Sequence, residues 1–256
     1  MKYIDIHAHL DFPHFDIDRE EIIADMLAKD LGAFNIGTTL ETSQNSIAFA
    51  QKYENIWAVV GVHPIHTNES LLDDLQKIEP LITHSKCVAI GECGLDFFKK
   101  ADDMENKKIQ LEFFEKQIEL ALTHNKPLMI HCREAYPETL EVLKNYKNSH
   151  SNLHAHFHFF TESVDIARII LDLGFTVSFT GPITFADYDE LVKFVPLTSL
   201  MIETDAPYAA PKSSRGKRSD PRHILEIGAK IAQIKGLSEE EVFTQIRENV
   251  KKIYRV

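Results

Sequence analysis

Short apolar runs rich in β-branched residues recur along the chain at fairly regular intervals. Eight such runs cover residues 3–7, 33–38, 57–62, 88–92, 128–131, 153–159, 176–179 and 200–204. Most of them are almost continuously hydrophobic, without alternation of apolar and polar positions. Strands of a parallel sheet that is covered on both faces have this pattern. The runs therefore predict eight buried parallel strands.

The segments between these runs show helical periodicity. In one segment a single apolar stripe is formed by Leu111, Phe114, Ile118, Ala121 and Leu122. The last segment begins with a capping box of Ser238 and Glu241. Eight strand–helix units predict a (β/α)8 TIM barrel, which we expect to form a single domain over residues 1–256. A doubly wound open sheet is the alternative, but no GxGxxG or GxxxxGKS/T phosphate-binding loop supports it.

Composition and charge exclude several classes of protein. The chain has 44% hydrophobic and 26% charged residues, as is ordinary for a globular protein. No window reaches the roughly 18 apolar residues that cross a bilayer, so we do not expect a membrane protein. The chain starts without secretory-signal features and its three cysteines lack CxxC spacing, which favours a cytoplasmic location. The net charge of −11 argues against non-specific coating of nucleic acid, and no obligate protein partner is evident.

Ionisable side chains gather where six of the eight predicted strands end. The candidates are His7, His9, Glu92, His131, one histidine of the sixth strand, and Asp205. His7 and His9 stand two positions apart on a strand, so their Cα atoms lie about 6–7 Å apart and their side chains share a face and can converge on one ion. Two half-buried histidines bonded to the backbone are the simple alternative for this pair alone. Because active sites of TIM barrels lie at the C-terminal strand ends, the whole set predicts a metal site.

The number of candidate ligands indicates two metal ions. Four imidazoles and two carboxylates exceed the three protein ligands of a typical mononuclear catalytic zinc site. Two ions about 3.5–4 Å apart, bridged by a carboxylate and a water, would use all six ligands. Mixed nitrogen and oxygen ligands suit zinc, manganese or iron, whereas magnesium prefers oxygen. We expect two divalent ions and leave their identity open among Zn²⁺, Mn²⁺ and Mg²⁺.

An ordered set of motifs spans essentially the whole chain. The motifs are DIHAHLD (5–11), VGVHP (60–64), AIGECGLDFF (89–98), PLMIHCREA (127–135), HFFTES (158–163), SFTGPITF (178–185), IETDAPYAAP (202–211) and RGKRSDP (215–221). This set resembles the TatD-type metal-dependent deoxyribonucleases of the amidohydrolase superfamily. The resemblance implies a binuclear site with His7 and His9 on one ion, His131 and His158 on the other, Glu92 bridging the two ions, and Asp205 binding metal and acting on the nucleophilic water.

The sixth strand departs from the family pattern, and the identity of the histidine that it supplies as a ligand is open. His154, His156 and His158 fall on one face of this strand, and only one of them is expected at the height of the metals. We predict His158, because it begins the sequence HFFT, which is similar to the His-x-Phe-Ser/Thr pattern of the family, and keep His156 as the alternative. Glu162 stands where the family usually has glycine, so a carboxylate is expected near the mouth.

Two carboxylates are predicted to act in catalysis. A water between two divalent ions is deprotonated near neutral pH, and Asp205 could accept or orient its proton. The simple alternative for Asp205 is a cap on the following segment. Glu92 lies in an apolar strand, where an unpaired carboxylate would be costly to bury and two cations would relieve that cost.

Four further residues are predicted to contact the substrate. His63 precedes Pro64 and faces the mouth, with a structural hydrogen bond as its alternative role. Arg133 either contacts phosphate or pairs with a carboxylate outside the ligand set. Arg215 and Arg218 lie in a basic run after the last strand, where they are either phosphate clamps or part of a solvated loop.

The leading functional hypothesis is hydrolysis of DNA phosphodiester bonds by two divalent metals. The resemblance implies that DNA is cut from an end, on single-stranded or frayed substrate, as an exonuclease does. The alternative is hydrolysis of a lactone or cyclic amide at the same site. Many such enzymes bridge their metals with a carbamylated lysine, but the fourth strand offers Glu92 and no lysine before Lys99. A metal-stabilised binding protein without turnover is a third hypothesis.

Overall fold

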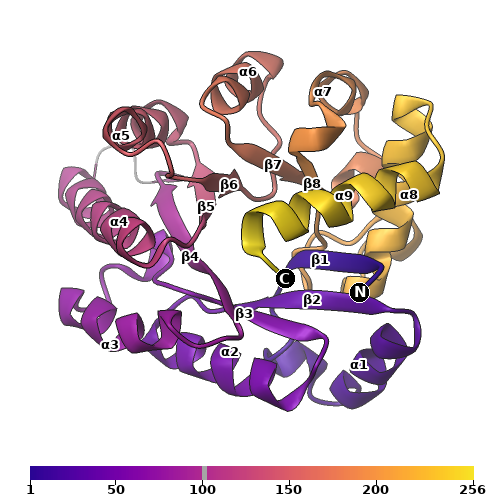
Figure 1. The fold of residues 1–256 in the computed structure, drawn as a ribbon, viewed down its shortest axis with the longest axis horizontal. Coiled ribbons are helices and arrows are strands. Elements are labelled where there is room, and N and C mark those ends of the chain that lie inside the picture. The colour runs from indigo at the N-terminus through magenta and orange to yellow at the C-terminus, as the bar shows by residue number, and fades with distance from the viewer. Residues whose placement is uncertain (100–102) are drawn as a thin grey trace.

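A computed structural model describes residues 1–99 and 103–256. Its centre is one sheet of eight parallel strands in sequential order. The strands are β1 (Tyr3–Ala8), β2 (Leu31–Ile36), β3 (Ile56–Val60), β4 (Cys87–Asp96), β5 (Leu128–Arg133), β6 (Ala155–Phe157), β7 (Thr176–Phe179) and β8 (Leu200–Ile202). Figure 1 shows them as an inner ring surrounded by helices. Because both faces of each strand are covered, the strands are almost entirely buried.

Helices follow the strands around the outside of the ring (Figure 1). They are α1 (Arg19–Ala28), α2 (Leu40–Lys52), α3 (Leu72–Ile82), α4 (Met104–His124), α5 (Tyr136–Ser149), α6 (Val164–Asp172), α7 (Asp189–Phe194), α8 (Ile224–Lys235) and α9 (Glu239–Tyr254). Short 3-10 helices lie in the connections, among them η1 (Pro13–Phe15), η2 (Pro64–His66) and η3 (Gly181–Thr184). Among the residues described, no helix combines the length and the apolar character needed to span a membrane.

The first and last strands meet just beyond the end of β8. Ala8 forms a parallel bridge with Ala206. The N–H of His9 donates to the carbonyl of Ala206 at 2.7 Å, and the N–H of Asp205 donates to the carbonyl of His7 at 2.9 Å. These bonds close the sheet into a barrel, and they also fix three predicted site residues next to one another.

The predicted TIM barrel is confirmed, with differences in strand length. β4 continues beyond its predicted end at Glu92 because it keeps pairing with β5 as far as Asp96. β6 and β8 end earlier than predicted. The chain leaves these two strands through residues in the left-handed region, Phe159 at φ 48° and Asp205 at φ 51°.

The last helix closes the N-terminal end of the barrel. As predicted, α9 begins with a capping box, in which Ser238 Oγ accepts from the N–H of Glu241 at 3.2 Å and the Glu241 carboxylate accepts from the N–H of Ser238 at 2.8 Å. α9 runs across the end of the barrel that faces the viewer in Figure 1. Its Tyr254 is buried and packs edge-on against Phe34 of β2, with ring centroids 4.9 Å apart. The candidate functional site lies at the opposite end of the barrel, where the strands end.

Candidate metal centre

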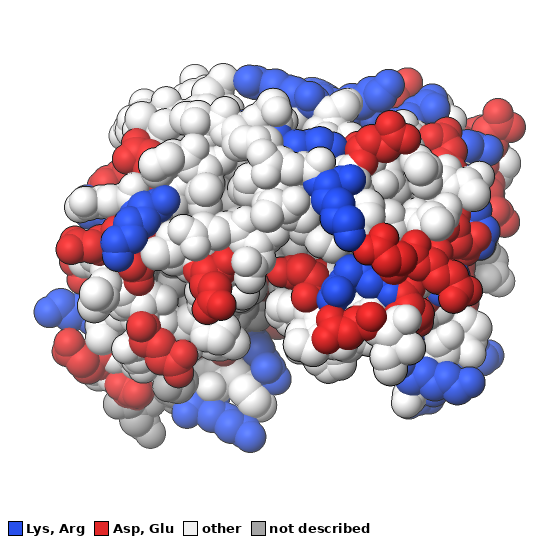
Figure 2. Space-filling model, turned by 90° about the horizontal axis from the view of Figure 1, so that it is seen from below, with Lys and Arg blue, Asp and Glu red and all other residues white. Residues whose placement is uncertain are grey.

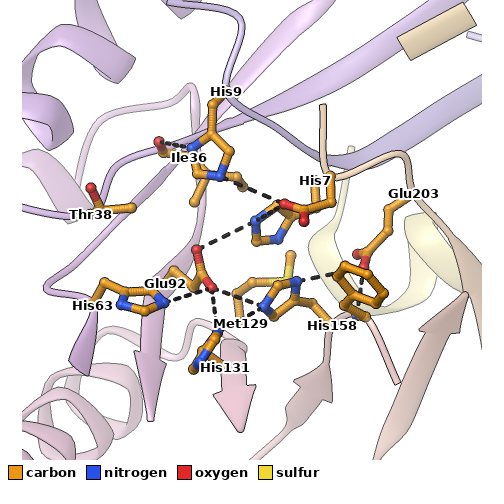
Figure 3. A network of polar contacts seen from close by, with 12 residues as sticks. His7, His9, Ile36, Thr38, His63, Glu92, Met129, His131, His158 and Glu203 are labelled. Atoms are coloured by element: carbon orange, nitrogen blue, oxygen red, sulfur yellow. Dashed lines mark hydrogen bonds and ion pairs between the residues drawn. The ribbon is translucent and has the colours of Figure 1, made fainter. Parts of the chain in front are cut away.

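The predicted ligands converge at the C-terminal end of the barrel. Three overlapping groups could each hold a metal ion, and they consist of His7, His9 and Asp205; His7, Glu92 and His158; and His63, Glu92 and His131. Within each group the ligand atoms lie within 4.8 Å of one another. All six predicted ligands belong to these groups, together with His63, which was predicted only as a substrate contact. Figure 3 shows the imidazoles arranged around Glu92.

Glu92 is the centre of the cluster. Its Oε1 lies 2.8 Å from His158 Nε2, 3.1 Å from His131 Nδ1 and 3.2 Å from His63 Nε2. Its Oε2 lies 3.4 Å from His7 Nε2. Burial alone would raise the pKa of Glu92, but the surrounding imidazoles hold it well below its usual range. A buried carboxylate kept charged and contacted on both oxygens is suited to lie between two cations.

A close approach of two strands brings Glu92 and His131 together. Gly94, two residues after Glu92, has φ +130°. A Cβ at this position would lie 2.1 Å from the carbonyl oxygen of His131 in β5. Glycine is therefore required for β4 to pass β5 at this distance.

His7 and His9 turn toward Asp205 on the other side of the cluster. Their Nε2 atoms lie 3.7 Å and 3.8 Å from Asp205 Oδ1. His9 Nδ1 lies 3.3 Å from the Ile36 carbonyl, so an N–H there leaves Nε2 free as a ligand. Burial lowers the pKa of His9 to about 3, which keeps its imidazole neutral, as metal ligation requires. Burial also raises the pKa of Asp205, to about 6.

The donor set fits divalent metal ions. Both ring nitrogens of His7 are buried and have no hydrogen-bond partner among the described residues. Buried polar atoms are almost always paired, so unpaired imidazole nitrogens beside carboxylates point to a cation. Imidazole with carboxylate is the ligand mixture of zinc, manganese and iron sites.

Two carboxylates that the sequence analysis missed stand behind the ligands. Asp96 Oδ2 lies 3.0 Å from His131 Nε2, on the side of the ring away from Glu92. Glu203 is fully buried and lies 3.6 Å from His158 Nδ1. Carboxylates in this position orient a ligating imidazole and raise its basicity. Both stand within motifs of the ordered set, Asp96 in AIGECGLDFF and Glu203 in IETDAPYAAP.

A third missed carboxylate holds the strand ends together. Asp5 is buried in β1 and accepts from the hydroxyl of Thr204 at 2.5 Å and from its N–H at 3.0 Å. It also accepts from the N–H of His7 at 3.1 Å. Asp5 thereby fixes the end of β8 beside His7.

The structure brings His158, and not His156, to Glu92. Both ring nitrogens of His156 are used, since Nδ1 lies 2.9 Å from Thr176 Oγ1 and Nε2 lies 2.9 Å from Ser178 Oγ. His156 is therefore a satisfied histidine of the barrel interior. Glu162 is exposed on the loop after β6.

The residues predicted to contact the substrate have different surroundings in the structure. His63 makes the structural hydrogen bond weighed for it, because its Nδ1 accepts from the N–H of Ile65, yet its Nε2 faces Glu92. The exposed Arg133 places its guanidinium over the ring of Phe98, with Cζ 3.6 Å from the centroid. The exposed Arg215 lies in the same way over Phe185, at 4.5 Å.

Arg218, predicted as either a phosphate clamp or part of a solvated loop, forms an ion pair with Asp18. Its two terminal nitrogens donate to the two carboxylate oxygens of Asp18 at 2.8 and 2.6 Å, and one of them also donates to the carbonyl of His14 at 2.6 Å. This bidentate pair ties the loop after β8 to the segment before α1. Arg218 therefore has a structural role in this arrangement.

Comparisons with known proteins agree with this geometry. The family model described as TatD related DNase matches residues 4–255. A metal-dependent hydrolase of Bacillus subtilis, YabD, is 35% identical over 98% of each chain. A Citrobacter koseri protein described as a 3'-5' ssDNA/RNA exonuclease, TatD, is 30% identical over 98% of each chain. The crystal structure of YjjV, a TatD homologue from Escherichia coli, superposes with a TM-score of 0.90 at 25% identity, covering 100% of this chain and 98% of that one.

These matches extend over the whole barrel and include the strand ends that carry the cluster. The resemblance inferred from the motifs is confirmed. The chain belongs to the TatD-related DNase family and is a metal-dependent hydrolase.

Proposed function

We propose that this protein hydrolyses phosphodiester bonds of DNA, removing nucleotides from an end of a single-stranded or frayed substrate. The observation that carries the proposal is the pairing of guanidinium groups with aromatic rings beside the metal centre, Arg133 on Phe98 and Arg215 on Phe185. Guanidinium groups bind phosphate and aromatic faces stack on bases, so such pairs suit a nucleotide better than a lactone. The exonuclease description of the Citrobacter relative supports the same substrate.

Apolar side chains around the mouth add to this support. Most of the large hydrophobic residues that are exposed in the described chain lie in or next to loops that follow strands, namely Ile17, Ile65, Leu71, Met104, Phe185 and Tyr208. Bases that are not paired expose apolar faces, which such side chains can contact. The lower edge of Figure 2, which faces away from the viewer in Figure 1, is notched, and Lys and Arg side chains project on both lobes beside the notch.

The side chains of the cluster would have different roles in hydrolysis. His7, His9, Glu92, His131, His158 and Asp205 would hold the metal ions, with His63 as a further ligand or a contact to the phosphate. When bound, divalent ions lower the pKa of water and offset the charge that develops on the phosphoryl oxygens. Asp205 would take a proton from the attacking water, as a carboxylate beside the His7 and His9 imidazoles can do. Arg133 and Arg215 would orient the phosphate backbone at the rim.

The proposal includes two divalent ions. His7 belongs to two of the three donor groups and Glu92 to two of them, and one ion could not satisfy all three groups. Glu92 offers an oxygen to the histidines on each side, as a bridging ligand would. Zn²⁺, Mn²⁺ and Mg²⁺ are the ions to test.

One assay tests the substrate directly. Purified protein, stripped of metal and reloaded with Zn²⁺, Mn²⁺ or Mg²⁺, is incubated with end-labelled single-stranded and duplex DNA and, in parallel, with a panel of lactones. We expect release of mononucleotides from single-stranded DNA, with Asp205→Asn as the control against contaminating nucleases. Hydrolysis of lactones alone would support the alternative amidohydrolase function, and binding of DNA without any turnover would support a binding protein.

A further inference from the structure

A cavity lies at the end of the barrel opposite to the metal centre. It has a volume of about 290 Å³ and is bounded by segments that lead into β5, β6, β7 and β8 and by the end of α9. The metal ligands lie at or beyond the opposite ends of their strands. This basal cavity therefore lies at the N-terminal ends of these strands and beside the end of α9, which crosses the barrel on the side turned to the viewer in Figure 1.

The charge of the basal cavity is opposite to that of the chain. Lys126, Lys252 and Arg255 line it, and no Asp or Glu is among its lining residues in the described structure, although the chain carries a net charge of −11. Lys126 donates to the carbonyl of Cys87 at 2.6 Å, and Arg255 lies 3.1 and 3.2 Å from the side-chain amide oxygen of Asn125. Neither contact neutralises a charge. In the part of the chain that the structure covers, the ammonium group of Lys252 has no hydrogen bond or ion pair.

The remaining wall provides neutral polar groups. His154 contributes an imidazole whose Nε2 is buried and has no hydrogen-bond partner in the described part of the chain. Burial, together with the positive charges of Lys147 and Lys252, lowers the pKa of His154 to about 4. Hydroxyl groups of Thr198 and Ser199 line the same wall. An anion would find both cations and neutral hydrogen-bond donors here.

We propose that the basal cavity binds a small phosphorylated molecule, either inorganic phosphate or a phosphomonoester. Lys and Arg together recognise phosphate, which can accept several charge-assisted hydrogen bonds at once. The volume admits a phosphate with a small polar body and excludes a polymer strand. The competing role of the three cations is to offset the negative partial charge at the C-terminal ends of α4 and α9, which both lie at this cavity. The proposal does not depend on the DNA substrate of the metal centre.

Equilibrium dialysis with labelled inorganic phosphate tests the proposal. Protein treated with a chelator is used, so that phosphate cannot bind through metal ions at the other end of the barrel. We expect one phosphate per chain, with an affinity that falls as salt is raised. Displacement by deoxyadenosine monophosphate but not by deoxyadenosine would identify a phosphomonoester site, and displacement by neither would identify a site for free phosphate.

Charge substitutions locate the binding. Lys252→Glu and Arg255→Glu should each weaken phosphate binding about tenfold or more, because each removes a charged hydrogen-bond donor and adds repulsion. Lys252→Gln, which removes the charge without reversing it, should weaken it less. The matched control is Lys251→Glu, an exposed neighbour on α9 that does not line the cavity. Absence of phosphate binding by the wild-type protein, or equal binding by Lys252→Glu and Lys251→Glu, would overturn the proposal and leave the cations as partners of the helix ends.

Discussion

Removal of divalent ions should lower the thermal stability of this protein, and their return should raise it. The reason lies in His7, whose ring nitrogens are both buried and have no hydrogen-bond partner among residues 1–99 and 103–256. The carboxylates of Glu92 and Asp205 lie within 4 Å of its Nε2. A buried polar group left unsatisfied costs about 1–3 kcal/mol. An ion that binds these nitrogens removes that cost from the native state and has no comparable site in the unfolded chain.

The expected size of the effect follows from linkage. An ion present at about 100 times its dissociation constant stabilises the native state by about 2.7 kcal/mol. In a chain of this length, 1 kcal/mol shifts the midpoint of thermal unfolding by about 2–4 °C. The shift should therefore be about 5–11 °C for one ion, and larger if a second ion binds independently.

The measurement is thermal unfolding by circular dichroism of chelator-treated protein, titrated with Zn²⁺, Mn²⁺ and Mg²⁺. His7→Leu should lose most of the rise in midpoint, because it removes the shared ligand of two donor groups. His150→Gln is the control, since this histidine is exposed and lies outside the cluster. A wild-type midpoint that responds to none of the three ions, or a full response in His7→Leu, would refute the reasoning.

Four substitutions separate metal binding, proton transfer, DNA binding and structural support. Asp205→Asn should lower DNA turnover about 100-fold or more, as expected for loss of a general base, while metal content measured by mass spectrometry stays close to two ions. Glu92→Gln should instead reduce the metal content itself, because the charged centre of the cluster is lost. Arg215→Ala should weaken DNA binding with a reduced salt dependence, measured by fluorescence anisotropy. Arg218→Ala should leave DNA affinity unchanged and lower the free energy of unfolding by about 0.5–1 kcal/mol, because its partner is Asp18.

The barrel and the gathering of the candidate ligands at one mouth could be predicted from sequence because each depends on a local pattern. Continuous apolar runs mark strands that are covered on both faces, and all eight were found. The ligands follow from position, because residues at the ends of parallel barrel strands must meet at one mouth. The same rule placed Glu92 and Asp205 in one site although they are far apart in the chain.

Residues that act through another side chain could not be found in this way. Asp96 was missed because the predicted strand ended at Glu92, whereas β4 uses Gly94 to pass close to β5 and continues to Asp96. The ion pair of Arg218 was not predicted because its partner, Asp18, lies in a distant part of the sequence. Neither contact leaves a local signal.

Backbone direction at the strand ends is the other feature without a sequence signal. Glu134, Phe159 and Asp205 follow β5, β6 and β8, and all three have left-handed φ values between 48° and 53°. Glycine or asparagine normally marks such positions, and for other residues this conformation costs about 1–3 kcal/mol. The barrel tolerates the cost at Asp205 because its N–H donates to His7 and its carbonyl accepts from Tyr208 at 2.8 Å. This turn of the chain directs the Asp205 carboxylate toward the imidazoles, so part of the site's geometry is stored in backbone strain that only the folded barrel can maintain.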